Sequence, residues 1–573
     1  MDSRTAAHVL SQIAAYLELS GANRYKARAY QTAARSLLAA NIDDLAVMLA
    51  SGELSRLRGI GPATLSVVRD LVETGESSYL EQLRTQMPEG LLEMMRVPGL
   101  SLEKIHTLHA QAGISSLEDL ELAATDGRIG KVKGFGPRTA QKILAGIEFM
   151  RTARHLTIYP QAIVAARAIV SAVRAHPDVA QAELAGSLRR IREVVADVDI
   201  VAACERSPED VAASFGRIAG VSHASKNGAS INIRFVDGTL LDLHCVLPAE
   251  YGAALWRATG TAEHVAGVAA RLATRGFTLD GDRLTQDGRP MPTPTEESLY
   301  DAAGLQWIPP ELREHQGEVD AAGQGALPDL LDASDIRGAL HCHSEYSDGK
   351  STIEEIGAAA RAKGWSYVGI SDHSQAAFYA SGLSRERVLE QHDEIDAFNA
   401  AHGDVRILKG IEADILADGR LDYDEALLGR FDYVIASIHS RFKMDGAAIT
   451  ERVLHAMDDP HMTILAHPTG RLLLSREPYA LDVEAVLQKA AAVGVAVELN
   501  CDPHRMDLDW RYLKRARELG VTVEIGPDAH SARSLEWTDL VVSMAHKGWL
   551  RRVDILNARE TEEVLAFARK RRS

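Results

Sequence analysis

Residues 185–201 read AGSLRRIREVVADVDIV, and this stretch determines how the middle of the chain is interpreted. Asp197 and Asp199 are separated by one valine, and residues i and i+2 of a strand face the same side. The two carboxylates therefore project together, while Val198 and Ile200 point into a core. Carboxylates this close repel each other unless a cation lies between them. We therefore predict a divalent metal site on this strand.

Residues before the aspartate pair indicate that a nucleoside triphosphate binds beside the metal site. Gly186 and Ser187 end the preceding strand and are followed by Arg190. A small residue at a turn, a hydroxyl and a guanidinium can together cradle phosphates. Asp242, in LLDLHCV, is flanked by leucines that face the other way. We predict that it joins the aspartate pair as a catalytic residue, with two Mg²⁺ or Mn²⁺ ions held for in-line displacement at phosphorus.

Length and composition set the broad class of the protein. The 573 residues allow several domains, and 46% of them are hydrophobic. No apolar run approaches the roughly 20 residues that span a bilayer. The four cysteines are scattered, which favours a reducing compartment. The net charge is −17, but the strip 131–154 is basic and remains compatible with DNA.

The N-terminal 150 residues are expected to form short helices and contain one pattern twice. LRGIGPATLSVV (57–68) and VKGFGPRTAQKI (132–143) both place Gly-apolar-Gly-Pro before a helix, and RVPGLSLEKIHTL (96–108) is a degenerate third copy. Glycines permit the tight turn, and proline suits the first helical position. The free N–H groups of such a helix start can hold a backbone phosphate of DNA. The expected DNA contacts are Gly59, Gly61, Gly134, Gly136, Arg138 and Lys142.

From residue 336 onward, apolar strands alternate with helices. The strands read RGAL, WSYVGIS, VRILKGIE, FDYVIASIH, MTILAH, VAVELN and VTVEIG. This alternation implies a parallel sheet closed as a barrel. Histidines and carboxylates directly follow six strand ends, where barrels carry their chemistry. The candidate metal ligands are His341, His343, Asp348, His373, Glu412, His439, His467, Asp528 and His530.

The composition of this set indicates its chemistry. Mixed imidazoles and carboxylates suit Zn²⁺, Mn²⁺ or Fe²⁺ rather than Mg²⁺, and nine ligands imply two or three ions. Clustered metals activate water and clamp phosphate oxygens, so we predict phosphoester hydrolysis. Arg471, just past a ligand, is either a contact to a substrate phosphate or a solvated loop arginine. Cys342 lies between two ligands and should pack on the other face of its strand.

These motifs also carry a family resemblance. The palm motifs resemble the nucleotidyltransferase signature of family X DNA polymerases, which consists of Gly-Ser, paired arginines, Asp-x-Asp and a later Asp. The barrel ligands are similar to those of the PHP (polymerase and histidinol phosphatase) domain. With the hairpin motifs and a thumb ending TEESLYDAAGLQWIPPELRE, nearly the whole chain resembles the bacterial form of this family. The resemblance implies that Thr259 and Gly260 bind the nucleotide.

The resemblance further implies the organisation and setting of the protein. We expect a monomeric, cytoplasmic, nucleoid-associated bacterial protein that acts in base excision repair on gapped or nicked DNA with dNTPs, and no membrane association. The fold class is multidomain α/β with a (β/α)7-like barrel. The expected parts are an 8-kDa-like helical DNA-binding domain (1–80), a fingers-like helix-hairpin-helix domain (81–152), a nucleotidyltransferase palm (153–247), a thumb (248–316), a linker (317–335) and a PHP metallo-hydrolase domain (336–573).

Four positions depart from the family pattern. Ala196 replaces a glycine that lies against the phosphates, and Ala258 replaces the ring that packs on the sugar. Val265 replaces an asparagine that reaches the base edge. Val67 occupies the place of the Schiff-base lysine of relatives that excise deoxyribose phosphate, so we predict no lyase activity through this residue.

Three functions therefore stay open. The retained aspartates favour a gap-filling polymerase with a 3′–5′ exonuclease in the barrel. The replacements at Ala196, Ala258 and Val265 favour a nuclease or phosphatase that processes DNA ends and uses the polymerase domain only to bind DNA. A small-molecule phosphatase of the histidinol phosphatase type is the third. The hairpin repeats disfavour it, since a small substrate needs no backbone clamp.

Overall fold

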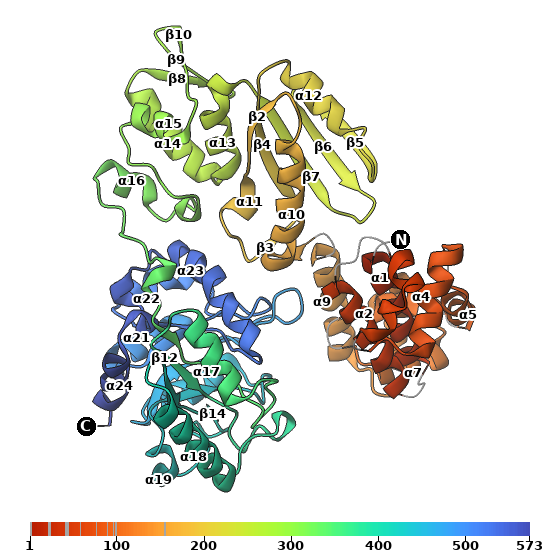
Figure 1. The fold of residues 1–573 in the computed structure, drawn as a ribbon, viewed down its shortest axis with the longest axis vertical. Helices are drawn as coiled ribbons and strands as arrows, with labels where there is room; N and C mark the ends of the chain where they lie inside the picture. The colour runs from red at the N-terminus through yellow and green to blue at the C-terminus, as the bar shows by residue number, and fades with distance from the viewer. Residues whose placement is uncertain are drawn as a thin grey trace. The chain divides into compact units, whose positions relative to one another are not determined.

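The computed structural model describes residues 3–20, 24–40, 45–57, 59–75, 77–86, 88, 90–95, 97, 100–153 and 156–572. The chain divides into two compact units, Met1–His155 and Leu156–Ser573. The first is drawn in red to orange and the second in yellow to blue (Figure 1). Within the described ranges, no helix is both long enough and apolar enough to cross a membrane.

The first unit is helical, and its apolar side chains form two clusters. The first cluster draws on the helices α1 to α5 and the second mainly on α6 to α9. Their bounds are α1 (Ser3–Leu19), α2 (Arg24–Ala40), α3 (Leu45–Ala50), α4 (Pro62–Thr74), α5 (Ser78–Gln86), α6 (Gly90–Met94), α7 (Leu102–Ala112), α8 (Leu117–Thr125) and α9 (Pro137–Ala153).

The two predicted hairpins are present in this unit. Each has a short 3-10 turn, then a glycine with positive φ (Gly59 at 83°, Gly134 at 93°), then α4 or α9 starting at a proline. A Cβ added at Gly61, Gly134 or Gly136 would meet no atom within 4 Å, whereas one at Gly59 would lie 2.6 Å from the side chain of Thr32. The second turn is therefore open to a ligand, and the first is open at Gly61. Residues 96, 98 and 99 of the third copy, and Arg154 of the basic strip, lie outside the described residues.

The second unit begins with the predicted palm, a five-stranded sheet of order β2-β4-β7-β6-β5. Strands β4 and β7 are parallel, and the other pairs are antiparallel. Alternate residues of β4 pack on α10 and α12 on one face and on α13 on the other. The bounds are α10 (Tyr159–Arg174), β2 (Val179–Leu184), β4 (Val198–Cys204), α12 (Pro208–Phe215), β5 (Val221–Asn227), β6 (Ser230–Phe235), β7 (Leu240–Val246) and α13 (Tyr251–Thr259).

The thumb follows as helices on a small antiparallel sheet. It comprises α13, α14 (Ala262–Thr274), β8 (Phe277–Asp280), β9 (Arg283–Gln286), β10 (Arg289–Met291) and α15 (Glu296–Ala303). The segment 317–335, expected to be a linker, begins with a short helix, α16 (Glu318–Gly323). Its Glu318 is buried, and its carboxylate lies 2.7 Å from Nδ1 of His264 in the thumb. This buried pair attaches the start of the segment to the thumb.

The C-terminal part is the predicted barrel, with a parallel strand at each of the seven expected positions. The strands are β11 (Gly338–Ala339), β12 (Tyr367–Ile370), β13 (Arg406–Lys409) continued by β14 (Glu412–Asp414), β15 (Val434–Ser437), β16 (Met462–Leu465), β17 (Ala496–Asn500) and β18 (Val523–Gly526). A parallel bridge between Cys342 and Ala529 closes the ring. Leu340, Tyr367 and Tyr433 help to fill its interior, and α24 (Thr561–Lys570) packs against this core.

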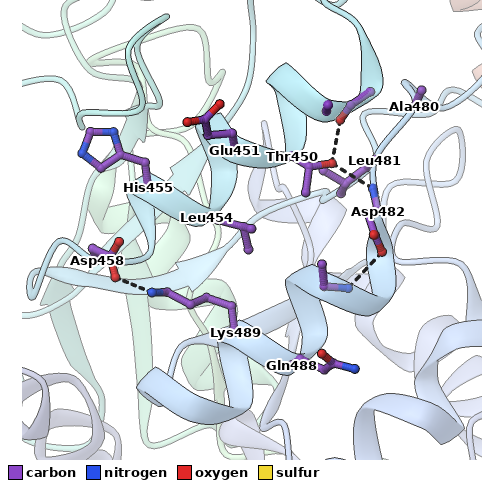
Figure 2. Close-up of a pocket in the computed structure, with 13 residues that line it drawn as sticks. Thr450, Glu451, Leu454, His455, Asp458, Ala480, Leu481, Asp482, Gln488 and Lys489 are labelled. Carbon is purple, nitrogen blue, oxygen red and sulfur yellow. Dashed lines mark hydrogen bonds and ion pairs between the residues drawn. The ribbon is translucent and has the colours of Figure 1, made fainter.

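Outer helices cover the barrel, among them α17 (Ile353–Ala362), α18 (Arg385–Ala401), α20 (Gly446–Ala456), α21 (Val483–Val493) and α23 (Trp537–Lys547). A hollow of about 1170 Å³ lies between α20 and α21 (Figure 2). None of the predicted site residues lines it. Its Lys489 and Asp458 are paired with each other, and Thr450 bonds the backbone of Asp482. These polar groups therefore already have partners in the protein.

A buried charge cluster joins the palm, the thumb and the barrel within the second unit. Glu314 of the thumb lies 2.7 Å from Nζ of Lys547 on α23, 3.1 Å from Arg190 and 3.3 Å from Arg192 of the palm. One carboxylate thus pairs with three cations. Burial lowers the pKa of Lys547 to about 8, although Glu314 opposes the shift.

This cluster predicts unequal costs for two substitutions. Glu314→Gln removes the carboxylate that pairs with Lys547, Arg190 and Arg192 and should lower the free energy of unfolding by about 3–5 kcal/mol. Lys547→Met removes one of three like charges and keeps the aliphatic volume, so it should lower the free energy of unfolding by less. All six tryptophans lie in the second unit. Denaturation followed by tryptophan fluorescence therefore measures this unit, and equal midpoints for the two variants would contradict the prediction.

Candidate functional site

The three predicted aspartates of the palm lie together. Asp199 in β4 is directly opposite Asp242 in the parallel strand β7, and Asp197 immediately precedes β4. Burial, followed by repulsion from Asp197 and Asp242, raises the pKa of Asp199 to about 7. The same two causes, burial and Asp242, raise the pKa of Asp197. A divalent cation would relieve this repulsion, so the carboxylates fit a metal site.

The turn after β2 fits against these aspartates. Gly186 has φ +59°, and a Cβ at this position would lie 1.7 Å from Oδ2 of Asp199. Only glycine therefore allows the turn to approach the carboxylate. The hydroxyl of Ser187 is buried and has no hydrogen-bond partner within residues 156–572. It is thus available to a ligand.

The paired arginines bring in the end of α13. Arg189 bonds the Thr259 hydroxyl at 2.9 Å and the Glu296 carboxylate, and Arg190 bonds the Thr259 carbonyl at 2.5 Å. Thr259 and its neighbour Gly260 therefore adjoin the predicted phosphate turn, although they are about 70 residues away in the sequence. Arg190 is also held by Glu314, so a phosphate that contacts it would have to compete with this carboxylate.

The departures from the family pattern have packing roles here. Ala258 packs against the small apolar cluster between β4 and α13, and Val265 packs against the thumb core. The neighbouring Arg257 pairs with Asp282 at 2.8 Å. Within the second unit, no aromatic ring or amide from positions 258 and 265 reaches toward the palm aspartates.

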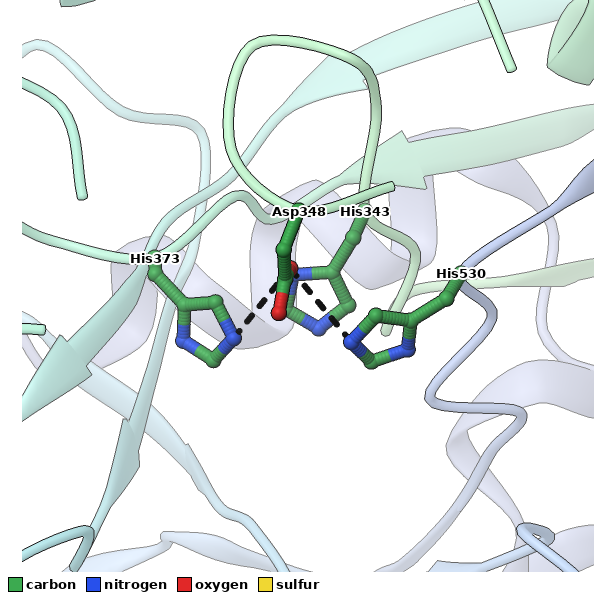
Figure 3. A group of neighbouring side chains, drawn as sticks. All are labelled: His343, Asp348, His373 and His530. Carbon is green, nitrogen blue, oxygen red and sulfur yellow. Dashed lines mark ion pairs between the residues drawn. The ribbon is translucent and has the colours of Figure 1, made fainter. Parts of the chain in front are cut away.

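The structure brings all nine predicted barrel residues to one mouth. They fall into four overlapping groups, and the candidate ligand atoms of each group lie within 4.8 Å of one another. Figure 3 shows one group, in which three imidazoles surround the carboxylate of Asp348. The groups are His343–Asp348–His373–His530, His341–Glu412–His467, His341–His343–Asp528 and His373–Glu412–His439.

Glu412 lies at the centre of this set. Its carboxylate is 2.8 Å from His373, 3.0 Å from His467 and 3.3 Å from His439. Burial would raise the pKa of Glu412, but the neighbouring histidines outweigh it and hold the pKa well below its usual range. The carboxylate is therefore ionised in the interior of the barrel.

Several features of the cluster fit metal ions. Nε2 of His341, both ring nitrogens of His343 and Nδ1 of His467 are buried without a hydrogen-bond partner within residues 156–572. Burial, together with His373 and His530, lowers the pKa of His343 to about 3, which favours the neutral imidazole that ligates metals. His467 and Asp528 have φ values of +25° and +47°. Such backbone strain is typical of functional sites.

A second layer orients the ligands, and the sequence reasoning missed it. The carboxylate of Glu498 lies 2.5 Å from Nδ1 of His341, and that of Asp414 lies 2.6 Å from Nδ1 of His439. Such carboxylate–histidine pairs fix the ring and raise its basicity as a ligand. Their sequence signal was present but weak. Asp414 lies two residues after Glu412 in β14, and Glu498 is the one acid in the apolar strand β17.

Two arginines near the mouth have different roles. Arg471 is buried and donates to the carbonyls of Arg505 and Met506 and to the carboxylate of Asp509. Its described contacts therefore hold the loop itself and do not reach the metal ligands. Nε of Arg505, which the sequence reasoning also missed, lies 3.3 Å from Oδ2 of Asp528. Arg505 is therefore the guanidinium placed beside the cluster.

The fit of Gly186 predicts a position-specific effect. Gly186→Ala should displace the Asp199 carboxylate and weaken Mn²⁺ binding at the palm. Gly228→Ala is the matched control, because Gly228 has φ +58° in the same domain but faces open space. Both changes should cost about 1–2 kcal/mol for the left-handed backbone. Mn²⁺ titration should separate the two variants, and equal Mn²⁺ affinities would contradict the prediction.

The second layer of the barrel predicts an effect on metal affinity. Asp414→Asn removes the charged partner of His439 and should weaken metal binding by about 10- to 100-fold. Asp424→Asn changes an exposed helix cap of the same barrel and should leave the affinity unchanged. Competition with a chelator measures both, and equal affinities would argue against a metal-orienting role for Asp414.

Four family models match the chain. They are a helix-hairpin-helix domain (1–77), a SAM-like helix-hairpin-helix tandem (91–148), a DNA polymerase beta thumb (254–314) and a PHP domain (339–500). These matches confirm the predicted multidomain α/β class, with a helical N-terminal region, a polymerase thumb and a C-terminal PHP barrel. The predicted limits of the individual domains stay predictions.

Curated relatives extend the comparison to the full length. The chain is 35% identical over 575 residues to the "DNA polymerase/3'-5' exonuclease PolX" of Bacillus subtilis (strain 168), covering 100% of both chains. Probable phosphatases of Syntrophotalea carbinolica and Shewanella sp. (strain MR-4) are each 31% identical, over 38% and 36% of this chain and 86% and 80% of their own lengths. The full-length match shows that the chain belongs to the PolX family of DNA polymerase/3′-5′ exonucleases.

Proposed function

We propose that the palm performs template-directed nucleotidyl transfer at DNA gaps, and that the barrel removes nucleotides from 3′ ends by phosphodiester hydrolysis. The observation that carries this proposal is the presence of two separate clusters of candidate metal ligands in one folded unit. One consists of Asp197, Asp199 and Asp242 on adjacent strands. The other is the nine-residue cluster at the barrel mouth.

In the palm, the aspartates would hold two Mg²⁺ or Mn²⁺ ions, which supply the charge that stabilises in-line displacement at phosphorus. Gly186 lets the phosphate turn lie against Asp199. The unpaired hydroxyl of Ser187 donates to a triphosphate oxygen, and Arg190 binds the triphosphate once it exchanges Glu314 for phosphate. Thr259 and Gly260 form the adjoining wall, where Arg189 bonds the Thr259 hydroxyl.

In the barrel, two or three Mn²⁺, Zn²⁺ or iron ions bound by the nine residues would supply a Lewis acid and an activated water. Glu498 accepts from Nδ1 of His341, and Asp414 from Nδ1 of His439, so Nε2 of each ring faces the cluster. Arg505 offers a positive charge to a phosphate oxygen beside Asp528. These residues orient the ligands and the scissile phosphate.

DNA binding by the first unit supports both activities. We assign backbone phosphate contacts to the two glycine turns, with nearby cations adding charge. This backbone contact is independent of sequence and falls with salt. The cell context that we propose is base excision repair by a monomer in the bacterial cytoplasm. The assigned contacts are Gly59, Gly61, Gly134, Gly136, Arg138 and Lys142.

A second candidate function keeps the barrel activity and drops synthesis. It is favoured by Ala258 and Val265, which pack inside the protein, and by the hold of Glu314 on Arg190. In that case the palm only binds DNA, and the barrel processes its ends.

Primer extension on a duplex with a one-nucleotide gap separates the two functions. Protein with His341→Ala, which silences the barrel, should extend the primer with Mn²⁺, and a further Asp199→Asn change should abolish extension. The matched control is Asp237→Asn, an exposed aspartate between β6 and β7 of the same sheet. No extension by the His341→Ala protein, with intact exonuclease activity in the unchanged chain, would establish the second function instead.

A further inference from the structure

Two aromatic side chains stand exposed at the mouth of the barrel. Phe378 and Tyr379 lie in a short 3-10 turn that follows the ligand His373 by a few residues. Phe378 is 87% exposed, the largest value among the large hydrophobic residues that the structure describes, and Tyr379 is 59% exposed. Single exposed apolar residues need no explanation, but two adjacent rings beside a metal cluster form a localised apolar surface.

These rings continue the ligand cluster outward. The Tyr379 ring lies 6.3 Å from the His373 ring and 6.1 Å from the His439 ring, measured between centroids. The Phe378 ring lies 6.1 Å beyond it and is nearly perpendicular, at 78°. A flat group stacked on these rings would therefore lie close to His373 and His439, which belong to the metal-ligand cluster.

Basic residues on the loops after other ligands accompany the rings. Lys350 follows Asp348 by two residues, Arg441 follows His439 by two, and Arg533 follows His530 by three. All three side chains belong to exposed residues. Within residues 156–572, none of these three forms an ion pair. Unpaired cations at the mouth of an acidic protein favour a polyanion.

We propose that Phe378 and Tyr379 form a nucleobase-stacking subsite for the single-stranded DNA end that enters the barrel, while Lys350, Arg441 and Arg533 contact its backbone. Stacked aromatics with a basic groove are the usual way to hold single strands, and they tolerate every base because each has a π face. This inference rests on the proposed exonuclease role of the barrel. It adds the residues that hold the base next to the scissile phosphate.

The first test reads out stacking without hydrolysis. A single-stranded oligonucleotide with 2-aminopurine as its 3′-terminal base is mixed with the full chain in EDTA. Fluorescence of the terminal base should fall on binding, because stacking quenches it. The double change Phe378→Leu with Tyr379→Leu keeps apolar bulk but removes both π faces, and it should abolish the quenching. Tyr379→Phe and the exposed Val553→Ala on the same barrel are controls that should retain it.

The second test compares two DNA ends in Mn²⁺. For the unchanged protein, KM should be about tenfold higher for a 3′-terminal abasic residue than for a normal nucleotide, because the abasic end has nothing to stack. The double leucine variant should show no such difference. Retained quenching, or retained discrimination in that variant, would overturn the subsite. If the unchanged protein cuts neither end, the proposed exonuclease role fails, and quenching alone still decides the subsite.

Discussion

Ionisable side chains crowded into a low-dielectric interior constrain both centres of this molecule. In the palm, the register places Asp199 opposite Asp242, and burial, followed by repulsion from Asp197 and Asp242, raises the pKa of Asp199 to about 7 despite the opposing charge of Arg190. In the barrel, Glu412 is buried among imidazoles that keep it ionised. The palm is thus left with a demand for divalent cations, whereas the barrel combines imidazoles and carboxylates that can ligate several of them.

The fold supplies the geometry that this constraint needs. Parallel strands bring side chains from distant parts of the sequence to one edge, and the bridge between Cys342 and Ala529 closes the barrel so that the first and last ligand pairs meet. The local backbone conformation is also adapted to the two sites. Gly186 leaves room for the Asp199 carboxylate, and Asp528 accepts a left-handed φ to face the cluster. Carboxylates behind His341 and His439 then fix the ring orientations.

The sequence predicts those parts of the molecule that periodicity and strand ends encode. The seven barrel strands follow from the apolar runs, and the gathering of nine ligands follows from the histidines and acids at six of the strand ends. Other contacts depend on tertiary packing between distant residues. Glu498 is an acid in a largely apolar strand, and the sequence of this strand does not show that it pairs with His341. Glu314 pairs with Lys547, which is 233 residues away. The segment that contains α16 has a loop-like composition, which predicts a linker. The buried contact of Glu318 with His264 outweighs this composition and holds α16 against the thumb.

The most direct test of two separate metal centres is anomalous X-ray scattering at the manganese edge from crystals grown with Mn²⁺. The account predicts two or three peaks among the nine barrel residues and further peaks between Asp197, Asp199 and Asp242. The palm peaks should disappear with Asp199→Asn, while the barrel peaks stay. Manganese in the barrel alone, with a nucleotide present and the palm aspartates unchanged, would contradict the claim that the palm is a metal-dependent catalytic centre.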